Sequence, residues 1–250
     1  MKSFLKKLIN KLGYNVTKIR NNLDNINEII KNKIPSDPII FDVGGNIGQS
    51  IQKFTDIFKN PTIHSFEPSV KDYEFMNKHY GLKKDIYLNN YALGEKIENK
   101  KFNLALETAT SSFNKINKNT EWLKHLTKKH NIKNNEYIIS DNEVKINTLD
   151  NYFKKYEITK IDLLKIDTQG YEDKVLEGSL NSIKNNKIGA ILTEIMFDDV
   201  YDKYFSFSEI EKYLTKENYR MVAIELSNNN LFSGLTFAAD VLYLNRKHHG

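Results

Sequence analysis

The stretch FDVGGNIGQS, Phe41 to Ser50, decides the fold of this chain. A run of β-branched and aromatic residues leads into two adjacent glycines, and a third glycine, Gly48, opens a predicted helix. This order is typical of a strand that ends in a ligand-binding turn. A dinucleotide, a phosphate group and S-adenosylmethionine are the candidate ligands for such a turn.

Strands and helices alternate outward from this turn. The predicted strands are 39–43, 62–66, 86–89, 161–167, 188–195 and a closing pair, 219–226 and 239–245, joined by a loop that contains Gly234. The predicted helices are 50–58, 69–81, 171–183 and 208–216. This alternation predicts an α/β fold with a doubly wound, mostly parallel seven-stranded sheet and helices on both faces. Ligands of such sheets bind at the carboxyl ends of the strands.

Two segments depart from the alternation. Residues 1–34 carry apolar side chains at helical spacing and predict a short amphipathic helical extension ahead of a domain spanning 35–250. We expect this extension to pack on the domain or on a second copy of the chain, as in a homodimer; attachment to a membrane surface is the alternative. The segment near 104–144 is too long for an ordinary connection and predicts a lid or substrate-binding insertion.

Composition limits the class of protein. A chain of 250 residues with 40% hydrophobic and 28% charged residues fits one globular domain, and its apolar runs are far shorter than the roughly 18 residues of a membrane span. The absence of cysteine excludes disulfides and thiolate metal sites. Residues 1–33 carry a net charge of +6 and the rest −1, so we expect no nucleic-acid binding. The start of the chain lacks the pattern of a secretion signal, which predicts a cytoplasmic protein, with peripheral contact to the inner membrane as an option.

The residues around the glycines separate the candidate ligands. A nucleotide-triphosphatase loop requires Lys followed by Ser or Thr after its last glycine, whereas Gly48 is followed by Gln49 and Ser50. Asp42 precedes the glycines; an acid there is unfavourable beside a pyrophosphate and suits the cationic amino-acid end of S-adenosylmethionine. Glu67, at the end of the next strand, suits the ribose of either cofactor. The pattern favours S-adenosylmethionine.

Six motifs, FDVGGNIGQS, SFEPS, NNYALG, TSSF, INTLDNYF and DLLKIDTQGYEDKVLEG, follow one another along the chain. In this order they resemble the FkbM-type S-adenosylmethionine-dependent methyltransferases, over most of residues 39–245. The resemblance implies a class I, Rossmann-like methyltransferase fold and methylation of hydroxyl groups on sugars or polyketide-like natural products. The cofactor-binding residues that we expect are Asp42, Gly44, Gly45, Asn46, Ser50, Glu67, Pro68, Asn90, Ala92 and Asp167.

Methyl transfer to an alcohol requires a group that accepts the hydroxyl proton close to the methyl carbon. Asp167, at the end of its strand, is the first candidate, as a base, a metal ligand or a hydrogen-bond acceptor; capping the following turn is the structural alternative. Glu194 can direct a second carboxylate into the same cleft, and the two acids could share a divalent cation, although no metal is the favoured prediction. Lys165 lies on the same strand face as Asp167, where it is expected to form an ion pair or to bind the alkoxide.

Three neighbouring polar positions carry further expectations. Gln169 stands where the resembled family usually has Glu, and an amide cannot accept the proton. Glu172 begins a predicted helix and is expected to interact with the helix dipole. His64 lies inside a predicted strand and is expected to be a packed core residue.

The insertion holds the candidate acceptor-binding residues Ser111, Ser112, Trp122 and Lys124. Residues 115–133 contain six lysines and one acid, which predicts a basic lid for an anionic acceptor; a solvated helix is the alternative. Trp122 is expected either to stack on a sugar or base, or to cover the core. The predicted activity is O-methylation of a nucleotide-linked or phosphorylated sugar for capsule or other surface polysaccharide. A secondary-metabolite O-methyltransferase and a noncatalytic scaffold are the alternatives.

Overall fold

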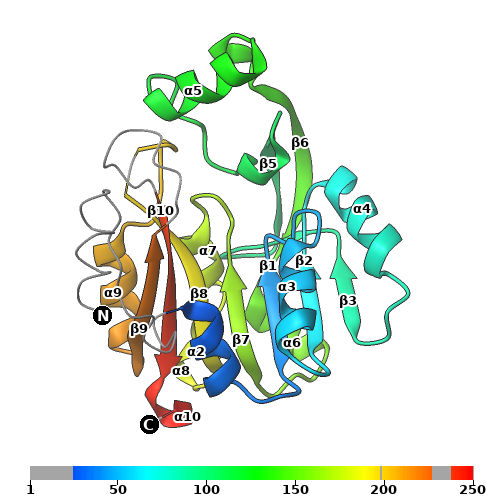
Figure 1. Cartoon of the computed structure of the whole chain (residues 1–250), viewed down its shortest axis with the longest axis vertical. Helices are drawn as coiled ribbons and strands as arrows, with labels where there is room; N and C mark the ends of the chain where they lie inside the picture. The colour runs from blue at the N-terminus through cyan, green and yellow to red at the C-terminus, as the bar shows by residue number, and fades with distance from the viewer. Residues whose placement is uncertain (1–24, 198, 227–237, 250) are drawn as a thin grey trace, which may run out of the picture.

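A seven-stranded sheet forms the centre of the computed structural model, which describes residues 25–197, 199–226 and 238–249 (Figure 1). The strands run in the order β3-β2-β1-β7-β8-β10-β9. Their bounds are β1 Ile39–Val43, β2 Thr62–Phe66, β3 Ile86–Asn89, β7 Ile161–Ile166, β8 Ile188–Met196, β9 Tyr219–Leu226 and β10 Ala238–Asn245. Strands β3, β2, β1, β7 and β8 pair in parallel, and β10 is antiparallel to both of its neighbours. The predicted mostly parallel seven-stranded sheet is confirmed.

The stretch that begins at Phe41 supplies the strand at the centre of this fold. Ile40, Phe41 and Val43 are at most 1% exposed, because helices cover β1 on both faces. A parallel strand that is covered on both faces needs a nearly continuous apolar sequence, and both β1 and β7 have one. The strand order reverses between β1 and β7. In open parallel sheets this reversal is where a ligand-binding crevice forms.

Helices cover both faces of the sheet, as predicted. One face packs against α2 (Ile26–Lys33), α3 (Gln49–Ile57) and α4 (Val70–Tyr80). The other packs against α6 (Leu149–Lys155), α7 (Glu172–Glu177), α8 (Leu180–Lys184) and α9 (Phe207–Thr215), and α10 (Arg246–His249) follows β10. Within the described residues, every helix is too short or too polar to span a bilayer. Residues 1–24 of the predicted extension and the predicted loop around Gly234 lie outside the described residues.

The prediction of one helix over 171–183 is wrong, because the chain divides there into α7 and α8. The break follows Gly178, which lies so close to the main chain of Gly94 that an added Cβ would come 1.9 Å from the Gly94 carbonyl oxygen. The amide of Ser182 donates to the carboxylate of Asp150 at 2.9 Å, so a residue distant in sequence caps α8. Neither contact is visible in the local apolar pattern.

The segment predicted as a lid is part of a longer insertion, residues 92–147, which contains a second sheet of three strands in the order β4-β6-β5. Its elements are β4 (Ala92–Leu93), β5 (Glu98–Ala105), η1 (Thr108–Thr110), α5 (Glu121–His130), η2 (Asn134–Glu136) and β6 (Ile138–Asn147). Figure 1 shows the insertion beyond the carboxyl ends of β1 and β7. The expected span of 104–144 therefore begins inside β5 and ends inside β6. These strands were not predicted from the sequence, because β4 has only two residues and because polar residues interrupt the apolar pattern of β5 and β6.

The described part of the predicted N-terminal extension is α2 together with the residues that flank it. Ile26 and Ile30 are 1% and 0% exposed, and they pack in the same core cluster as Ile40 of β1. These contacts agree with the expectation that the extension packs on the domain. The helix contributes apolar burial that the sheet would otherwise lack on this face.

We expect Ile30→Ala to lower the free energy of unfolding by about 2–5 kcal/mol, because it leaves a cavity where the native side chain is fully buried. Urea denaturation followed by circular dichroism measures this change. Glu28→Ala, on the exposed side of the same helix, is the control and is expected to change the free energy by less than about 0.5 kcal/mol. Equal, small effects of the two variants would show that α2 does not support the core.

Candidate functional site

The carboxyl ends of β1, β2 and β7 open into a cavity of about 280 Å³. This volume lies near the lower end of the roughly 300–1,000 Å³ that small-molecule sites occupy. Of the predicted cofactor residues, Gly44, Gly45, Asn46, Ser50, Glu67, Pro68, Ala92 and Asp167 line the cavity. The insertion closes its far side with Phe102, Thr108, Ala109, Ser111 and Phe113.

The glycine turn lines the cavity and is held to the end of β2. The amides of Gly44 and Gly45 donate to the Phe66 carbonyl, at 3.0 and 3.1 Å. Gly44 has a φ of 84°, and a Cβ added to it would come 1.8 Å from the carbonyl oxygen of Asp167. A side chain therefore does not fit where the ends of β1 and β7 meet, and only glycine permits this approach.

Glu67 provides a carboxylate on the β2 side of the cavity. Its oxygens accept hydrogen bonds from the amides of Asn46 and Ser69, each at 2.8 Å. Burial raises the pKa of Glu67 to about 7, although these two hydrogen bonds act in the opposite direction. A carboxylate can accept about four hydrogen bonds, so Glu67 retains capacity for two hydroxyl groups of a ligand. This donor and acceptor set fits the ribose of an adenosine cofactor.

Two aromatic residues of the insertion, Phe102 and Phe113, also line the cavity, whereas the side chains of Phe66 and Leu93 are fully buried behind it. Aromatic side chains suit the flat face of an adenine ring. Asn90 was expected at this end of the ligand, but it does not line the cavity. Its side-chain amide donates instead to the main-chain carbonyl of Glu67 at 3.0 Å, which fixes the strand end that carries the carboxylate.

Lys165 lies between two carboxylates on the β7 side of the cavity. Its Nζ is 3.2 Å from Oδ1 of Asp42 and 3.4 Å from Oδ2 of Asp167, and it donates to the Gly44 carbonyl at 3.2 Å. Burial acts to lower the pKa of Lys165, but the two carboxylates outweigh it, and the pKa lies above its usual value. Lys165 is therefore a charged ion-pair partner, the first of its two expected roles.

The structure corrects the expectation that Asp42 contacts the cationic end of the ligand. Asp42 is fully buried and does not line the cavity. Its carboxylate accepts a hydrogen bond from Ser65 Oγ at 3.0 Å and pairs with Lys165. The charge of Asp42 is thus compensated inside the protein, behind the glycine turn.

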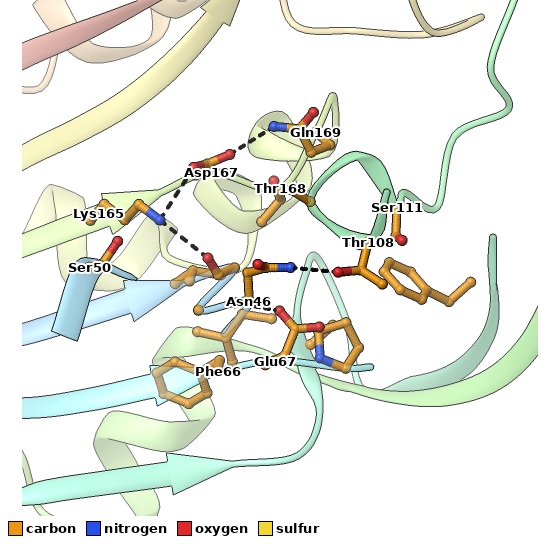
Figure 2. A pocket seen from close by; sticks show the side chains of 18 of the residues that line it. Asn46, Ser50, Phe66, Glu67, Thr108, Ser111, Lys165, Asp167, Thr168 and Gln169 are labelled. Atoms are coloured by element: carbon orange, nitrogen blue, oxygen red, sulfur yellow. Dashed lines mark hydrogen bonds and ion pairs between the residues drawn. The ribbon is translucent and has the colours of Figure 1, made fainter. Parts of the chain in front are cut away.

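Asp167 is the carboxylate that faces the cavity from β7, with a side chain that is 41% exposed. Figure 2 shows Lys165, Asp167 and Gln169 in a row on one side of the cavity, with Asn46 and Glu67 on the other. Oδ1 of Asp167 accepts a hydrogen bond from Nε2 of Gln169 at 2.9 Å. Asp167 therefore has one contact with a cation and one with a neutral amide, and keeps accessible surface toward the cavity.

Glu194 belongs to the same hydrogen-bonded group but does not line the cavity. Its Oε2 accepts from the same Nε2 of Gln169 at 3.0 Å. Burial, followed by the negative charge of Asp167, raises the pKa of Glu194 well above its usual value. The amide lies between the two carboxylates, at the place where a shared cation was considered. Among the described residues, no group of three or more His, Cys, Asp or Glu is arranged to hold a metal ion.

Glu172 and His64 do not line the cavity, and both have structural partners. Glu172 accepts hydrogen bonds from two amides of the turn 168–170, at 2.8 and 3.2 Å, and burial raises its pKa to about 7. It shapes the turn that follows β7. His64 is packed in the core as predicted: it stacks on Tyr87, its Nδ1 lies 2.9 Å from the Tyr152 hydroxyl, and burial lowers its pKa to about 4.

Of the four residues expected to bind the acceptor, the structure places Ser111 in the cavity lining. Ser112 is buried, and its hydroxyl donates to the main-chain carbonyl of Gln169 at 2.7 Å. Ser112 therefore connects the insertion to the turn after β7 and does not line the cavity.

Trp122 and Lys124 also lie away from the cavity lining. Trp122 packs against Tyr137 and Tyr201, so it has the core-covering role that was its alternative. Lys124 is on the exposed side of α5 and forms an ion pair with Glu121. The helix α5 is solvated on that side.

Half of the cavity lining was not identified from the sequence: Val43, Gln49, Phe66, Leu93, Phe102, Thr108, Ala109, Phe113, Thr168 and Gln169. Thr108 illustrates the reason. Its hydroxyl accepts a hydrogen bond from the side-chain amide of Asn46 at 3.3 Å and donates to the carboxylate of Asp72 at 3.2 Å. Both partners are remote in sequence. Gln169 could have been found from its place two residues after Asp167 in the DTQG motif.

Comparison with known proteins gives one family. A family model described as the methyltransferase FkbM domain matches residues 42–221. No curated protein matches the chain at a significant level.

Similar solved structures include an rRNA methylase from Streptococcus thermophilus, with 8% identity, a TM-score of 0.46, and coverage of 92% of this chain and 99% of that one. Sp1610 of Streptococcus pneumoniae, in complex with S-adenosyl-L-methionine, has 11% identity and a TM-score of 0.48, and the match covers 91% of this chain and 73% of that one. Precorrin-6y C5,15-methyltransferase from Geobacter metallireducens has 8% identity and a TM-score of 0.43, and the match covers 91% of this chain and 93% of that one. Similarities this low carry no argument about substrate.

The raised pKa of Glu67 predicts a pH dependence of ligand binding. The ionised carboxylate accepts hydroxyl hydrogen bonds, and a group with a pKa of about 7 is roughly one-tenth ionised one pH unit below that value. We expect the affinity for S-adenosylhomocysteine to rise by up to about tenfold between pH 6 and pH 8, measured by calorimetric titration. Glu67→Gln, which does not titrate, is expected to bind more weakly and without this slope. A flat profile for the unmodified protein would contradict a role for Glu67 in binding.

Proposed function

This chain belongs to the FkbM methyltransferase family and uses S-adenosylmethionine as its methyl donor; we propose that it transfers the methyl group to a hydroxyl of a sugar. The acceptor is a nucleotide-linked or phosphorylated sugar for capsule or another bacterial surface polysaccharide. One observation carries the hydroxyl assignment: the accessible carboxylate of Asp167 faces the same cavity as Glu67, from the opposite side.

The residues of the cavity support a defined placement for each part of the donor. Glu67 accepts the ribose hydroxyls, and the aromatic side chains of Phe102 and Phe113 contact the adenine. The turn at Gly44 and Gly45 borders the amino-acid portion. When bound, S-adenosylmethionine supplies a methyl group on a sulfonium, which leaves as a neutral thioether.

Asp167 is proposed to accept the proton of the acceptor hydroxyl as the new carbon–oxygen bond forms. An alcohol is a weak nucleophile while it is protonated, so a positioned base contributes to the rate. Lys165 forms an ion pair with one carboxylate oxygen of Asp167, and the Gln169 amide holds the other. The insertion that closes the cavity excludes water, which strengthens these charge interactions.

The basic surface of the insertion supports an anionic acceptor. Lys124, Lys128 and Lys129 are all exposed on α5. Lys124 and Lys129 form ion pairs with Glu121 and Glu107, which compensate part of this charge. A positive surface beside the closed side of the cavity raises the local concentration of a phosphorylated sugar. An uncharged secondary metabolite, the alternative acceptor, gains nothing from these lysines.

Asp167→Asn is expected to lower kcat by about a hundredfold or more, because it removes the proton acceptor while preserving size. Release of S-adenosylhomocysteine is measured during incubation with S-adenosylmethionine and a panel of nucleotide-linked sugars, free sugars and polyketides. The melting temperature and S-adenosylhomocysteine affinity of the variant serve as controls and are expected to change little. Activity that is lost with chelator and restored by magnesium would assign Asp167 to metal binding, and near-normal turnover of the variant would remove it from the reaction.

Neutralising Lys124, Lys128 and Lys129 by substitution with Gln is expected to raise KM for an anionic sugar acceptor several-fold, and more at low than at high ionic strength, because salt screens exposed charges. The matched control replaces Lys154, Lys155 and Lys184, exposed lysines on α6 and α8, in the same way. Identical KM values for the two triple variants across ionic strengths would contradict the anionic acceptor.

A further inference from the structure

Gln169 makes four hydrogen bonds that join the strand ends to the insertion. Its Nε2 donates to Asp167 at 2.9 Å and to Glu194 at 3.0 Å. Its Oε1 accepts from the Tyr201 hydroxyl at 3.1 Å, and its main-chain carbonyl accepts from Ser112 Oγ at 2.7 Å. Gln169 has a φ of 58°, in the left-handed region that residues other than Gly, Asn and Asp rarely adopt. Contacts of this number, made by a residue in an uncommon conformation, indicate a specific role.

We propose that Gln169 is a positioning residue for methyl transfer, which orients the Asp167 carboxylate toward the acceptor by donating one amide hydrogen to Asp167 and the other to Glu194. This inference rests on the proposed function, since it concerns the use of Asp167 as a proton acceptor. It assigns a task to the position at which the sequence showed only the loss of an acidic group.

The two hydrogen bonds from Gln169 Nε2 to Asp167 and Glu194 form a bridge between these carboxylates. The chemistry of the amide explains why this bridge has one orientation. A primary amide has two N–H hydrogens on its nitrogen and only acceptor capacity on its oxygen. With the nitrogen toward Asp167 and Glu194, each carboxylate receives one hydrogen, and the oxygen receives the Tyr201 hydroxyl. The reverse orientation places the amide oxygen against two carboxylates and the nitrogen against a hydroxyl.

Tyr201 links this orientation to the insertion. The one hydrogen of its hydroxyl is shared between Gln169 Oε1 and the Thr110 carbonyl, which lies at 3.0 Å, and its ring packs against Trp122. Thr110 ends η1, whose residues Thr108 and Ala109 line the closed side of the cavity. The elements that enclose the acceptor and the carboxylate that receives its proton are thus held in register through one amide.

An acid at position 169 lacks the two donors that this arrangement uses. In Gln169→Glu, the introduced carboxyl group faces Asp167 and Glu194, so it is expected to retain a proton well above the usual pKa of a glutamate. Other charged or titratable groups around it are Lys165, Glu172, Asp240 and Tyr201, which also lie near Glu194 or Asp167. While protonated, the introduced group can donate to one carboxylate; when ionised, it repels both.

The first measurement tests the bridge without any acceptor. The urea midpoint of Gln169→Glu is compared with that of the unmodified chain from pH 5 to pH 8. When the pKa of a carboxyl group is higher in the folded than in the unfolded state, the folded protein loses stability as pH rises between the two values. The difference in urea midpoint between Gln169→Glu and the unmodified chain is therefore expected to widen with pH. Gln52→Glu is the matched control, because Gln52 donates to Asp56 at the exposed surface of α3 and its variant is expected to show no such widening.

The second measurement tests positioning in the reaction. With any acceptor that the panel identifies, Gln169→Leu is expected to lower kcat about tenfold or more at all pH values, with little change in KM, because a misplaced base costs rate and not affinity. Gln169→Glu is expected to approach the unmodified kcat near pH 6 and to fall away from it toward pH 8. Tyr201→Phe, which keeps the fold but removes the donor to Oε1, is expected to lie between the unmodified chain and Gln169→Leu.

The two measurements separate the failure of this inference from that of the proposed function. If no sugar is methylated but the midpoint gap widens with pH, the bridge stands and the acceptor assignment fails. If the gap stays constant and matches Gln52→Glu, the bridge is overturned. Unchanged kcat in Gln169→Leu and in Gln169→Glu at every pH would likewise overturn the positioning role.

Discussion

The buried ammonium of Lys165 is the interaction on which the rest of the site depends. It stands where the strand order reverses, and it pairs with one carboxylate on β1 and another at the end of β7. Without it, Asp42 and Asp167 would leave uncompensated negative charge beside a crowded glycine turn, and removal of one partner from such a buried set is costly. The same ammonium donates to the Gly44 carbonyl, so the turn, Asp167 and the central strand share one anchor.

Most of the main sheet could be predicted from the sequence, because its strands are covered on both faces and therefore have continuous apolar sequences. The bounds of β1, β2 and β3 agree with the predicted ranges. The polar strands β5 and β6 gave no such signal, since their pairing in a separate sheet is a long-range event. The break after Gly178 was missed for the same reason, because it arises from a contact with Gly94.

The residues of the candidate site likewise fall into those that could be predicted from the sequence and those that could not. Residues at the carboxyl ends of predicted strands, such as Glu67 and Asp167, were placed in the cavity because parallel strands end at one edge. The partners of those residues could not be placed. Asp42 fits a ligand contact by position alone, and only the register of β1 with β7 shows that Lys165 takes its charge. The enclosing residues come from the insertion, whose path no local pattern fixed.

The contact between Gly94 and Gly178 limits how sequences of this kind can diverge. A methyl group at position 178 would meet the Gly94 carbonyl oxygen, and one at position 94 would meet Ile146 at 2.8 Å. Either change would displace β4 from α7, and β4 pairs with β6, so the enclosure of the cavity would shift with it. The loops of the insertion lie outside this contact and can change in sequence without disturbing it, whereas the junction of the insertion with the sheet is held to the smallest residue.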